Sequence, residues 1–463
     1  MICFSGIGLA LASAPKAVEV TIYNNDFGLV KEVRSVRLAS GRQQIRIEDV
    51  PSAIDPSSVG IKSLTVSMPI QMLEQNYQYD LISPEKILEK SIGKRVKFTQ
   101  ILNNGQAAVI EGELLAAGNI VVKTDDGKIV LNPPGTIEVL EMPEGLISKP
   151  TLMWELETQN EGACDLELAY LTNAITWSAD YVLTLNAADT SADLNGWVTI
   201  NNRCGAAFND AVLKLVAGDV HRVESPGPPP AESGALKDKM DEKKLGFAEQ
   251  QLFEYHLYTL QRPATIRNNE IKQIALLSAS GVSVKKQLIF EGQGGLWRSY
   301  GAGFRPGEGY ATDPNSKVNV VVELQNSEKN KLGMPLPKGR IRVYKRDGSG
   351  QVQMIGEDEI DHTPREEKIR LYVGDAFDIV GQRKRTAFRK ISSRTVSETF
   401  EISLRNRKNT AETVRIVEHG WSEWTVLNAS QPWKKTDSNT FEFTQTLKPG
   451  EQKTLTYTIQ TRW

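Results

Sequence analysis

Hydrophobic and polar residues alternate along most of the chain with a period of two. The clearest example is the stretch 166–220, in which Trp177 and Tyr181 share one parity, and further alternating runs begin near Trp197 and Ala211. Side chains point to opposite faces of a strand in turn, so every second residue of such a run lies in a core. The pattern therefore predicts a β-sandwich core that contains Trp177.

Similar strand-like runs, separated by turn residues, recur from end to end, and they predict an all-β, multidomain fold with very little helix. The one clear helix signal begins at Ser83, a good N-cap, followed by Pro84, and ends at Gly93. The parts we expect are a signal-like segment (1–14), an N-terminal β-meander (15–80), a small SH3/Sm-like barrel (81–149), a β-sandwich core (150–365) and a C-terminal Ig-like sandwich (366–463).

Two stretches interrupt the alternation. Residues 222–247 combine a cluster of prolines with mixed charge, which predicts a disordered loop inside the sandwich core. Residues 291–316 are rich in glycine and aromatic residues, which indicates a long surface loop. Its Trp297 and Tyr300 are candidates for contact with a glycan or a peptide, and the alternative is a lid packed over its own core.

Composition and charge narrow the class of protein. Of 463 residues, 40% are hydrophobic and 24% are charged, and the net charge is −2. These values are ordinary for a soluble globular protein and provide no long-range attraction to nucleic acid, so we expect no nucleic-acid partner.

The first fourteen residues carry no charge and end in small residues, which is typical of a secretory signal cleaved here after Ala12. We therefore expect an extracytoplasmic, periplasmic location. The alternative is an apolar N-terminus that frays. The segment is too short to span a bilayer comfortably, so we do not expect an integral membrane protein.

Three cysteines are present, and Cys3 lies in the signal-like segment. Export would permit a disulfide between Cys164 and Cys204, and two buried free thiols are the equal alternative. The chain has neither a CxxC motif nor a Cys/His cluster, so we expect no metal site and no cofactor.

Several long strings resemble the bacterial DUF4139 family, over roughly residues 160–463. That family, which is related to the mucoidy-inhibitor-like proteins, is largely uncharacterised. The resemblance implies a β-rich fold and an envelope location, and it transfers no catalytic residues. The strings include YLTNAITWSADYVLTL, WVTINNRCGAAFNDAVLKLVAGDV and GRIRVYKRDGSGQVQMIGEDEIDHTPREEKIRLYVGDAFDIVGQRK.

No GxSxG, HExxH, GxGxxG or P-loop motif occurs, so candidate chemistry rests on charge runs. The acidic run Glu357–Asp361, followed by His362, could supply an acid and a base or bind a divalent ion. In a strand, however, Asp361 and His362 would point to opposite faces. The alternative is a turn with solvated charges.

Two further runs remain. The string GDAFD offers Asp375 and Asp378 as a ligand-binding pair. The alternative is a turn, with Asp375 bonded to its backbone and Phe377 filling a seam. The basic run 383–394 could bind anionic glycans or lipid headgroups, and its alternative is a solvated strand face.

Because no catalytic motif is present, the sequence favours a non-enzymatic envelope protein that binds or scaffolds an envelope protein or a glycan. The alternative is a carboxylate-dependent glycan or peptide hydrolase that uses Glu357–Asp361. A concave pocket holding two of these carboxylates would favour the hydrolase, whereas a flat, scattered set would favour the binding module.

Overall fold

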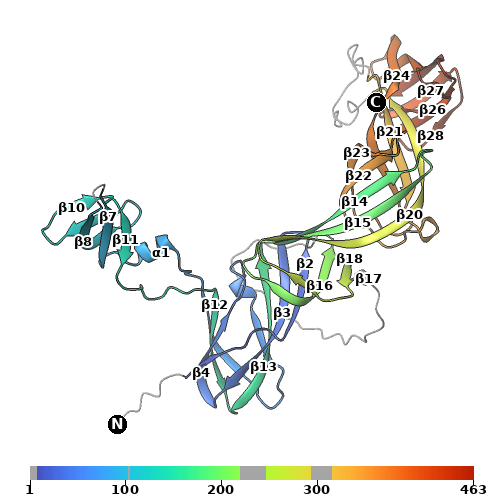
Figure 1. The fold of residues 1–463 in the computed structure, drawn as a ribbon. Helices are drawn as coiled ribbons and strands as arrows, with labels where there is room; N and C mark the ends of the chain where they lie inside the picture. Colours follow the sequence, from blue (N-terminus) through green and yellow to red (C-terminus); the bar gives the residue numbers. More distant parts are fainter. Residues whose placement is uncertain (1–7, 103–104, 219, 221–246, 294–314) are drawn as a thin grey trace. The chain divides into compact units, whose positions relative to one another are not determined.

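The computed structural model describes residues 8–102, 105–218, 220, 247–293 and 315–463. Strands account for 65% of the structure and helix for 3%, so the predicted all-β fold is confirmed. The chain divides into two compact units (Figure 1): unit 1 comprises residues 1–177 and 200–272, and unit 2 comprises residues 178–199 and 273–463.

Unit 1 contains a four-stranded and an eight-stranded sheet, and alternating burial along their strands produces its core. Trp154 and Tyr170 are among its largest fully buried side chains. One sheet has the order β1 (Gly8–Leu11), β4 (Gly41–Glu48), β12 (Thr151–Thr158), β6 (Gln71–Gln78). The other has the order β17 (Phe247–Leu252), β18 (Tyr255–Leu260), β16 (Phe208–Ala217), β2 (Ala17–Tyr23), β3 (Phe27–Leu38), β13 (Gly162–Asn173), β5 (Gly60–Ser63), with β19 (Ala264–Ile266) also on β16.

A five-stranded antiparallel sheet occupies residues 95–139, where the small barrel was predicted. Helix α1 (Pro84–Glu89) precedes it, and the Oγ of Ser83 accepts a hydrogen bond from the backbone N–H of Lys86 at 3.2 Å, so the predicted cap is confirmed. In the described residues, no pairing joins the two edge strands β10 and β11, so this five-stranded sheet is not closed. The order is β10 (Ile129–Leu131), β9 (Val121–Thr124), β8 (Ala107–Ala116), β7 (Arg95–Ile101), β11 (Thr136–Val139).

Unit 2 is built on a thirteen-stranded sheet system, and its largest core cluster lies among the C-terminal strands. The boundary predicted between residues 365 and 366 falls between β23 and β24, inside this unit. Its strands are β14 (Ile175–Leu185), β15 (Ser191–Asn202), β20 (Glu270–Glu291), β21 (Lys317–Gln325), β22 (Gly339–Arg346), β23 (Val352–Ile360), β24 (Lys368–Ser392), β25 (Thr395–Asn406), β26 (Glu412–His419), β27 (Glu423–Ala429), β28 (Trp433–Lys435), β29 (Thr440–Leu447) and β30 (Gln452–Arg462).

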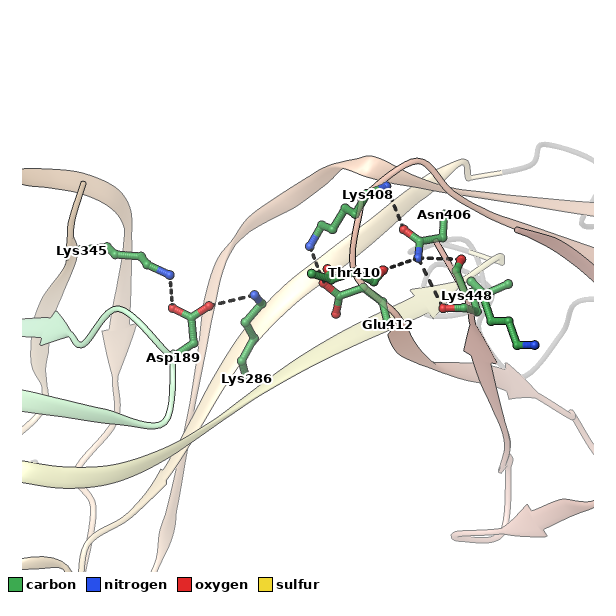
Figure 2. A network of polar contacts seen from close by, with 9 residues as sticks. Asp189, Lys286, Lys345, Asn406, Lys408, Thr410, Glu412 and Lys448 are labelled. Carbon is green, nitrogen blue, oxygen red and sulfur yellow. Dashed lines mark hydrogen bonds and ion pairs between the residues drawn. The ribbon is translucent and has the colours of Figure 1, made fainter. Parts of the chain in front are cut away.

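One local topology occurs three times along the chain. A fully buried asparagine ends or directly follows β15, β21 and β25, and the next strand pairs in parallel with an earlier one: β16 with β2, β22 with β14, β26 with β20. The side-chain amide of each asparagine ties the intervening loop to the backbone, as Figure 2 shows for Asn406. The amides donate from Asn202 to the carbonyls of Ala206 and Arg267, from Asn326 to those of Met334 and Pro364, and from Asn406 to those of Thr410 and Lys448.

A second polar clamp in unit 2 ties the turn between β14 and β15 to two other strands. Asp189 has a φ of 57° in that turn, and its carboxylate accepts a hydrogen bond from Lys286 of β20 at 2.9 Å. Lys345 of β22 donates to the other oxygen, so the carboxylate lies between two ammonium groups (Figure 2).

The sequence expectations for the unit 1 core can now be compared with the structure. Trp177 is 3% exposed, and its indole N–H donates to the carbonyl of Val216 at 3.2 Å, so its predicted burial is confirmed. Cys164 and Cys204 are both buried and are not joined. They have different neighbours, Ser63 for Cys164 and Ala206 for Cys204, so the structure contains the free-thiol alternative. Of the predicted loop 222–247, only Phe247 is described, and it begins β17.

Candidate functional site

Tryptophans gather in one region of the C-terminal strands of unit 2. Trp421, Trp424, Trp433 and Trp463 are four of the eight tryptophans in the chain. The ring centroids of Trp421 and Trp463 are 5.2 Å apart, and those of Trp424 and Trp433 are 6.3 Å apart. We call these four residues the tryptophan surface.

Strand pairing brings the tryptophan surface together. Strands β27 and β30 are antiparallel with Glu423 opposite Arg462, so the residues beyond this pair, Trp421 and Trp463, meet. Trp424 packs over Gly420, where a Cβ would collide with the indole ring. Its indole N–H donates to the carbonyl of Ser438 at 2.8 Å. Glycine at 420 and this hydrogen bond therefore fix the orientation of the ring.

The tryptophan surface belongs partly to the core and partly to the outside. The Trp424 ring lies 5.1 Å from that of Phe441, which is fully buried, whereas Trp433 is 38% exposed. Lys435 Nζ lies 4.6 Å from the centroid of the Trp424 ring, within range of a cation–π interaction. Rings anchored on one side and accessible on the other present rigid apolar area with polar groups at its rim.

A polar network adjoins the tryptophan surface through His419, the residue before Gly420. The Nε2 of His419 lies 3.0 Å from Glu291 Oε1, and its Nδ1 lies 3.1 Å from Thr440 Oγ1. Gln293 exchanges two hydrogen bonds with the His419 backbone, and Asn315 donates to the carbonyl of Glu291 at 3.1 Å. Trp297 and Tyr300 lie outside the described residues, so their role stays a prediction.

A buried charged network underlies His419. The Nε of Arg383 lies 2.9 Å from Glu418 Oε2, and its guanidinium lies 3.7 Å from the centroid of the Phe400 ring. Tyr457 donates to Glu418 and accepts from Arg383 at 3.1 Å, and burial raises the pKa of its phenol well above the usual value. Arg385 pairs with Glu398 at 2.9 Å and is also shielded. The interpretation of 383–394 as one basic surface is therefore wrong for its first two arginines.

The acidic run lies at the end of β23, far along the chain from the tryptophan surface. Because β23 ends at Ile360, Asp361 and His362 lie in the irregular segment that follows, and both line one hollow of about 480 Å³. The argument for opposite faces applied only to a continuing strand, so it does not apply to these two residues beyond the end of β23. Glu359 also lines this hollow, and it pairs with Lys338 at 3.4 Å. The described residues contain no group of three His, Cys, Asp or Glu side chains arranged to hold a metal ion.

Asp375 and Asp378 have separate surroundings. Asp375 accepts hydrogen bonds from Asn319 at 2.8 Å and from Tyr372 Oη at 2.9 Å, and it pairs with Lys317 at 2.9 Å. Although burial raises the pKa of Asp375, these partners outweigh that effect and lower it. The backbone carbonyl of Asp378 accepts a hydrogen bond from the N–H of Arg407 at 2.7 Å. Both residues lie within strand β24, and Asp375 is held by partners that keep it ionised.

Phe377, between these two aspartates, is 95% exposed, so its predicted place in a seam was wrong. The pairing of β24 with β21 shifts here: Asn319 faces Asp375, whereas Lys317 faces Val380. Extra residues on β24 therefore form a bulge, and a bulge changes which side chains point inward.

The sequence reasoning missed the tryptophan surface. Trp421, Trp424 and Trp433 occur in runs that alternate like ordinary strands, and nothing local indicates that their rings meet Trp463. The signal that could have found it was the concentration of tryptophans after residue 420, because four of the eight tryptophans of the chain lie there.

Fold and site together define a class: an all-β protein of several sheets with a partly exposed aromatic surface. A family model described as "Domain of unknown function (DUF4139)" matches residues 166–463, which is more than half of the chain. The protein therefore belongs to the DUF4139 family, in agreement with the resemblance noted above. A search of curated proteins finds none that matches. In the part of the chain that the structure describes, no helix has the length and apolar character needed to cross a membrane.

Proposed function

We propose that this protein is a non-enzymatic binding module of the cell envelope, and that its tryptophan surface contacts a glycan chain. The observation that carries the proposal is the gathering of Trp421, Trp424, Trp433 and Trp463, with Trp433 well exposed. Sugar rings present apolar C–H faces that pack on indole rings, and their hydroxyls bond to polar groups at a rim. Lys435, beside Trp424, supplies such a group.

The experiment compares two tryptophans of similar exposure. Trp433 is 38% exposed in the tryptophan surface, and Trp197 is 41% exposed on β15. We expect Trp433→Ala to weaken binding to an envelope polysaccharide by about tenfold, whereas Trp197→Ala leaves it unchanged. Affinity electrophoresis against a panel of purified cell-wall polysaccharides measures both. Equal losses in the two variants, or wild-type protein that binds none of the panel, would contradict the proposal.

Export is the second part of the proposal, and the uncharged segment 1–14 supports it. Strand β1 lies within that segment and pairs in parallel with β4, so cleavage after Ala12 would remove β1 and expose the edge of β4. N-terminal sequencing of the native protein from fractionated cells tests this. A mature start at Ser13 outside the cytoplasm is expected, and an intact Met1 in the cytosol would refute it.

One observation favours the hydrolase as a second candidate: Glu359, Asp361 and His362 line the same hollow. Carboxylates near an imidazole can act as general acid and base. Replacing Glu357, Glu359 and Asp361 by their amides separates the candidates. The triple variant should bind glycan like the wild type if the tryptophan surface is the functional site. If the wild type turns over a glycan or a peptide and the triple variant does not, the hydrolase reading replaces ours.

A further inference from the structure

The hollow at Asp361 has a neighbour of opposite charge in unit 2. A second hollow of about 370 Å³ is lined by residues of β20, β21 and the segment after β21, among them Lys285, Lys329 and Asn330. Lys368, at the start of β24, lines both hollows. The two hollows therefore adjoin along one wall, although their other lining residues are far apart in the sequence.

The charges of the two hollows differ in sign. The first contains three carboxylates, and the outer wall of the second contains the ammonium groups of Lys285 and Lys329. Between them, Lys368 and Arg370 lie 3.4 and 3.0 Å from the carboxylate oxygens of Glu323, which is largely shielded, so one carboxylate offsets one of the two cations of the shared wall. The pair thus has an acidic end and a basic end. The carboxylates of the first hollow belong to Glu359, Asp361 and Glu367.

Buried and partly buried asparagines hold the walls in place. Asn330 accepts from the N–H of Ser283 at 2.6 Å and donates to the carbonyl of Gln325 at 3.0 Å, which ties the basic wall to β20 and β21. Asn326 donates to the carbonyl of Pro364 at 2.9 Å, which ties the turn of the acidic hollow to the end of β21. Walls fixed in this way lose little conformational entropy when a ligand binds.

We propose that the two hollows form one site for a short peptide with free termini, whose ammonium group lies in the acidic hollow and whose carboxylate lies beside Lys285 and Lys329. A ligand with both charges can form charge-assisted hydrogen bonds at both ends, whereas a simple anion or cation satisfies only one. The linings are mostly polar, which suits the amide groups of a peptide backbone better than an apolar ligand. This site is independent of the tryptophan surface, and it includes the hollow in which the hydrolase candidate places its acids.

The test titrates the full chain with oligoalanines of three to six residues and measures binding by isothermal titration calorimetry. Varying the length identifies the peptide that spans both hollows best. Each length is compared with its N-acetylated and its C-amidated form. We expect the peptide with two free ends to bind, and each blocked end to weaken binding by about tenfold.

Two exposed residues make the test specific. Lys329→Ala should abolish the preference for a free carboxylate while keeping the preference for a free amine, and Asp361→Asn should do the reverse. Both side chains lie at the surface, so neither change threatens folding. Trp433→Ala should bind peptide normally, which separates this site from the glycan proposal. No binding at millimolar peptide, or blocked ends that change affinity equally in all variants, would overturn the inference.

Discussion

Two runs of charged residues in unit 2, one basic and one acidic, both lie on strands but differ in how far their first side chains are buried. The basic run begins with Arg383 on β24, and the acidic run begins with Glu357 on β23. The side chains of Arg383 and its partner Glu418 are 2% and 0% exposed, and both lie in the C-terminal core. Those of Glu357 and its partner Arg342 are 39% and 33% exposed. Similar charge patterns therefore gave one interior pair and one surface pair.

This difference shows that the free-energy cost of removing one partner of an ion pair depends on how deeply the pair is buried. Removing one partner of a buried pair leaves the other charge desolvated and unpaired, which typically costs about 3–5 kcal/mol. An exposed pair contributes only about 0–1 kcal/mol, because water and salt screen it. Charge patterning alone cannot separate these cases, since both follow the two-residue alternation of a strand.

The largest expected effect breaks the buried pair. Glu418→Gln leaves Arg383 charged in the core, and we expect it to lower the free energy of unfolding by about 3–5 kcal/mol. Urea denaturation measures the change, with Glu357→Gln as the matched control that should stay within about 1 kcal/mol. Equal effects of the two variants would show that the Arg383 network is solvated.

A second comparison tests whether burial also determines how much stability is lost when an aromatic residue is replaced by alanine. Trp177 is 3% exposed and Trp197 is 41% exposed. We expect Trp177→Ala to cost about 3–5 kcal/mol through lost packing and a cavity. Trp197→Ala should cost far less, and thermal unfolding followed by circular dichroism compares them. A Trp177→Ala variant that melts like the wild type would disprove the register of β14.

A smaller effect is expected for a buried group that is polar but uncharged. Asn406→Ala removes the donors to the carbonyls of Thr410 and Lys448 (Figure 2), and an unsatisfied buried group costs about 1–3 kcal/mol. The exposed Asn428 of β27 offers the control Asn428→Ala. Urea denaturation should rank Asn406→Ala between Glu418→Gln and the control. If Asn406→Ala equals its control, the loop does not depend on the asparagine clamp.

The smallest effect concerns the half-shielded clamp at Asp189. Burial raises the pKa of this carboxyl, but hydrogen bonds from Lys345 and Lys286 outweigh burial and lower the pKa below 3.8. Because the pKa of this carboxyl is lower in the folded than in the unfolded state, its ionised form stabilises the fold at pH values above the unfolded-state pKa. This contribution is lost as the pH falls through the folded-state pKa. The stability difference between wild type and Asp189→Asn should therefore be largest near neutral pH and shrink in acid. A difference that does not vary with pH would contradict this.

Much of the fold could be predicted from the sequence because the signals for strands and helix starts are local. The alternation around Trp177 predicted its burial, and the Ser83–Pro84 pair predicted the start of α1. The strands at 95–139 were predicted, but whether the two edge strands of their sheet pair depends on tertiary structure, and no local pattern encodes that. For Asp361 and His362, the end of β23 at Ile360, which lets both line one hollow, was not foreseen, and their role stays a prediction.

The sequence by itself determined the all-β character and the strand positions, because side-chain alternation and turn residues act over a few neighbours. The family followed from the resemblance of long strings of the sequence to a known family. Tertiary structure alone decided which charges were buried, which tryptophans met and which hollows adjoined. Arg383 and Glu418 lie on different strands, Trp421 meets Trp463 only through the pairing of β27 with β30, and Lys285, Lys329 and Lys368 meet around the end of β21. Such contacts depend on strand order and register, which are set by the packing of the whole core.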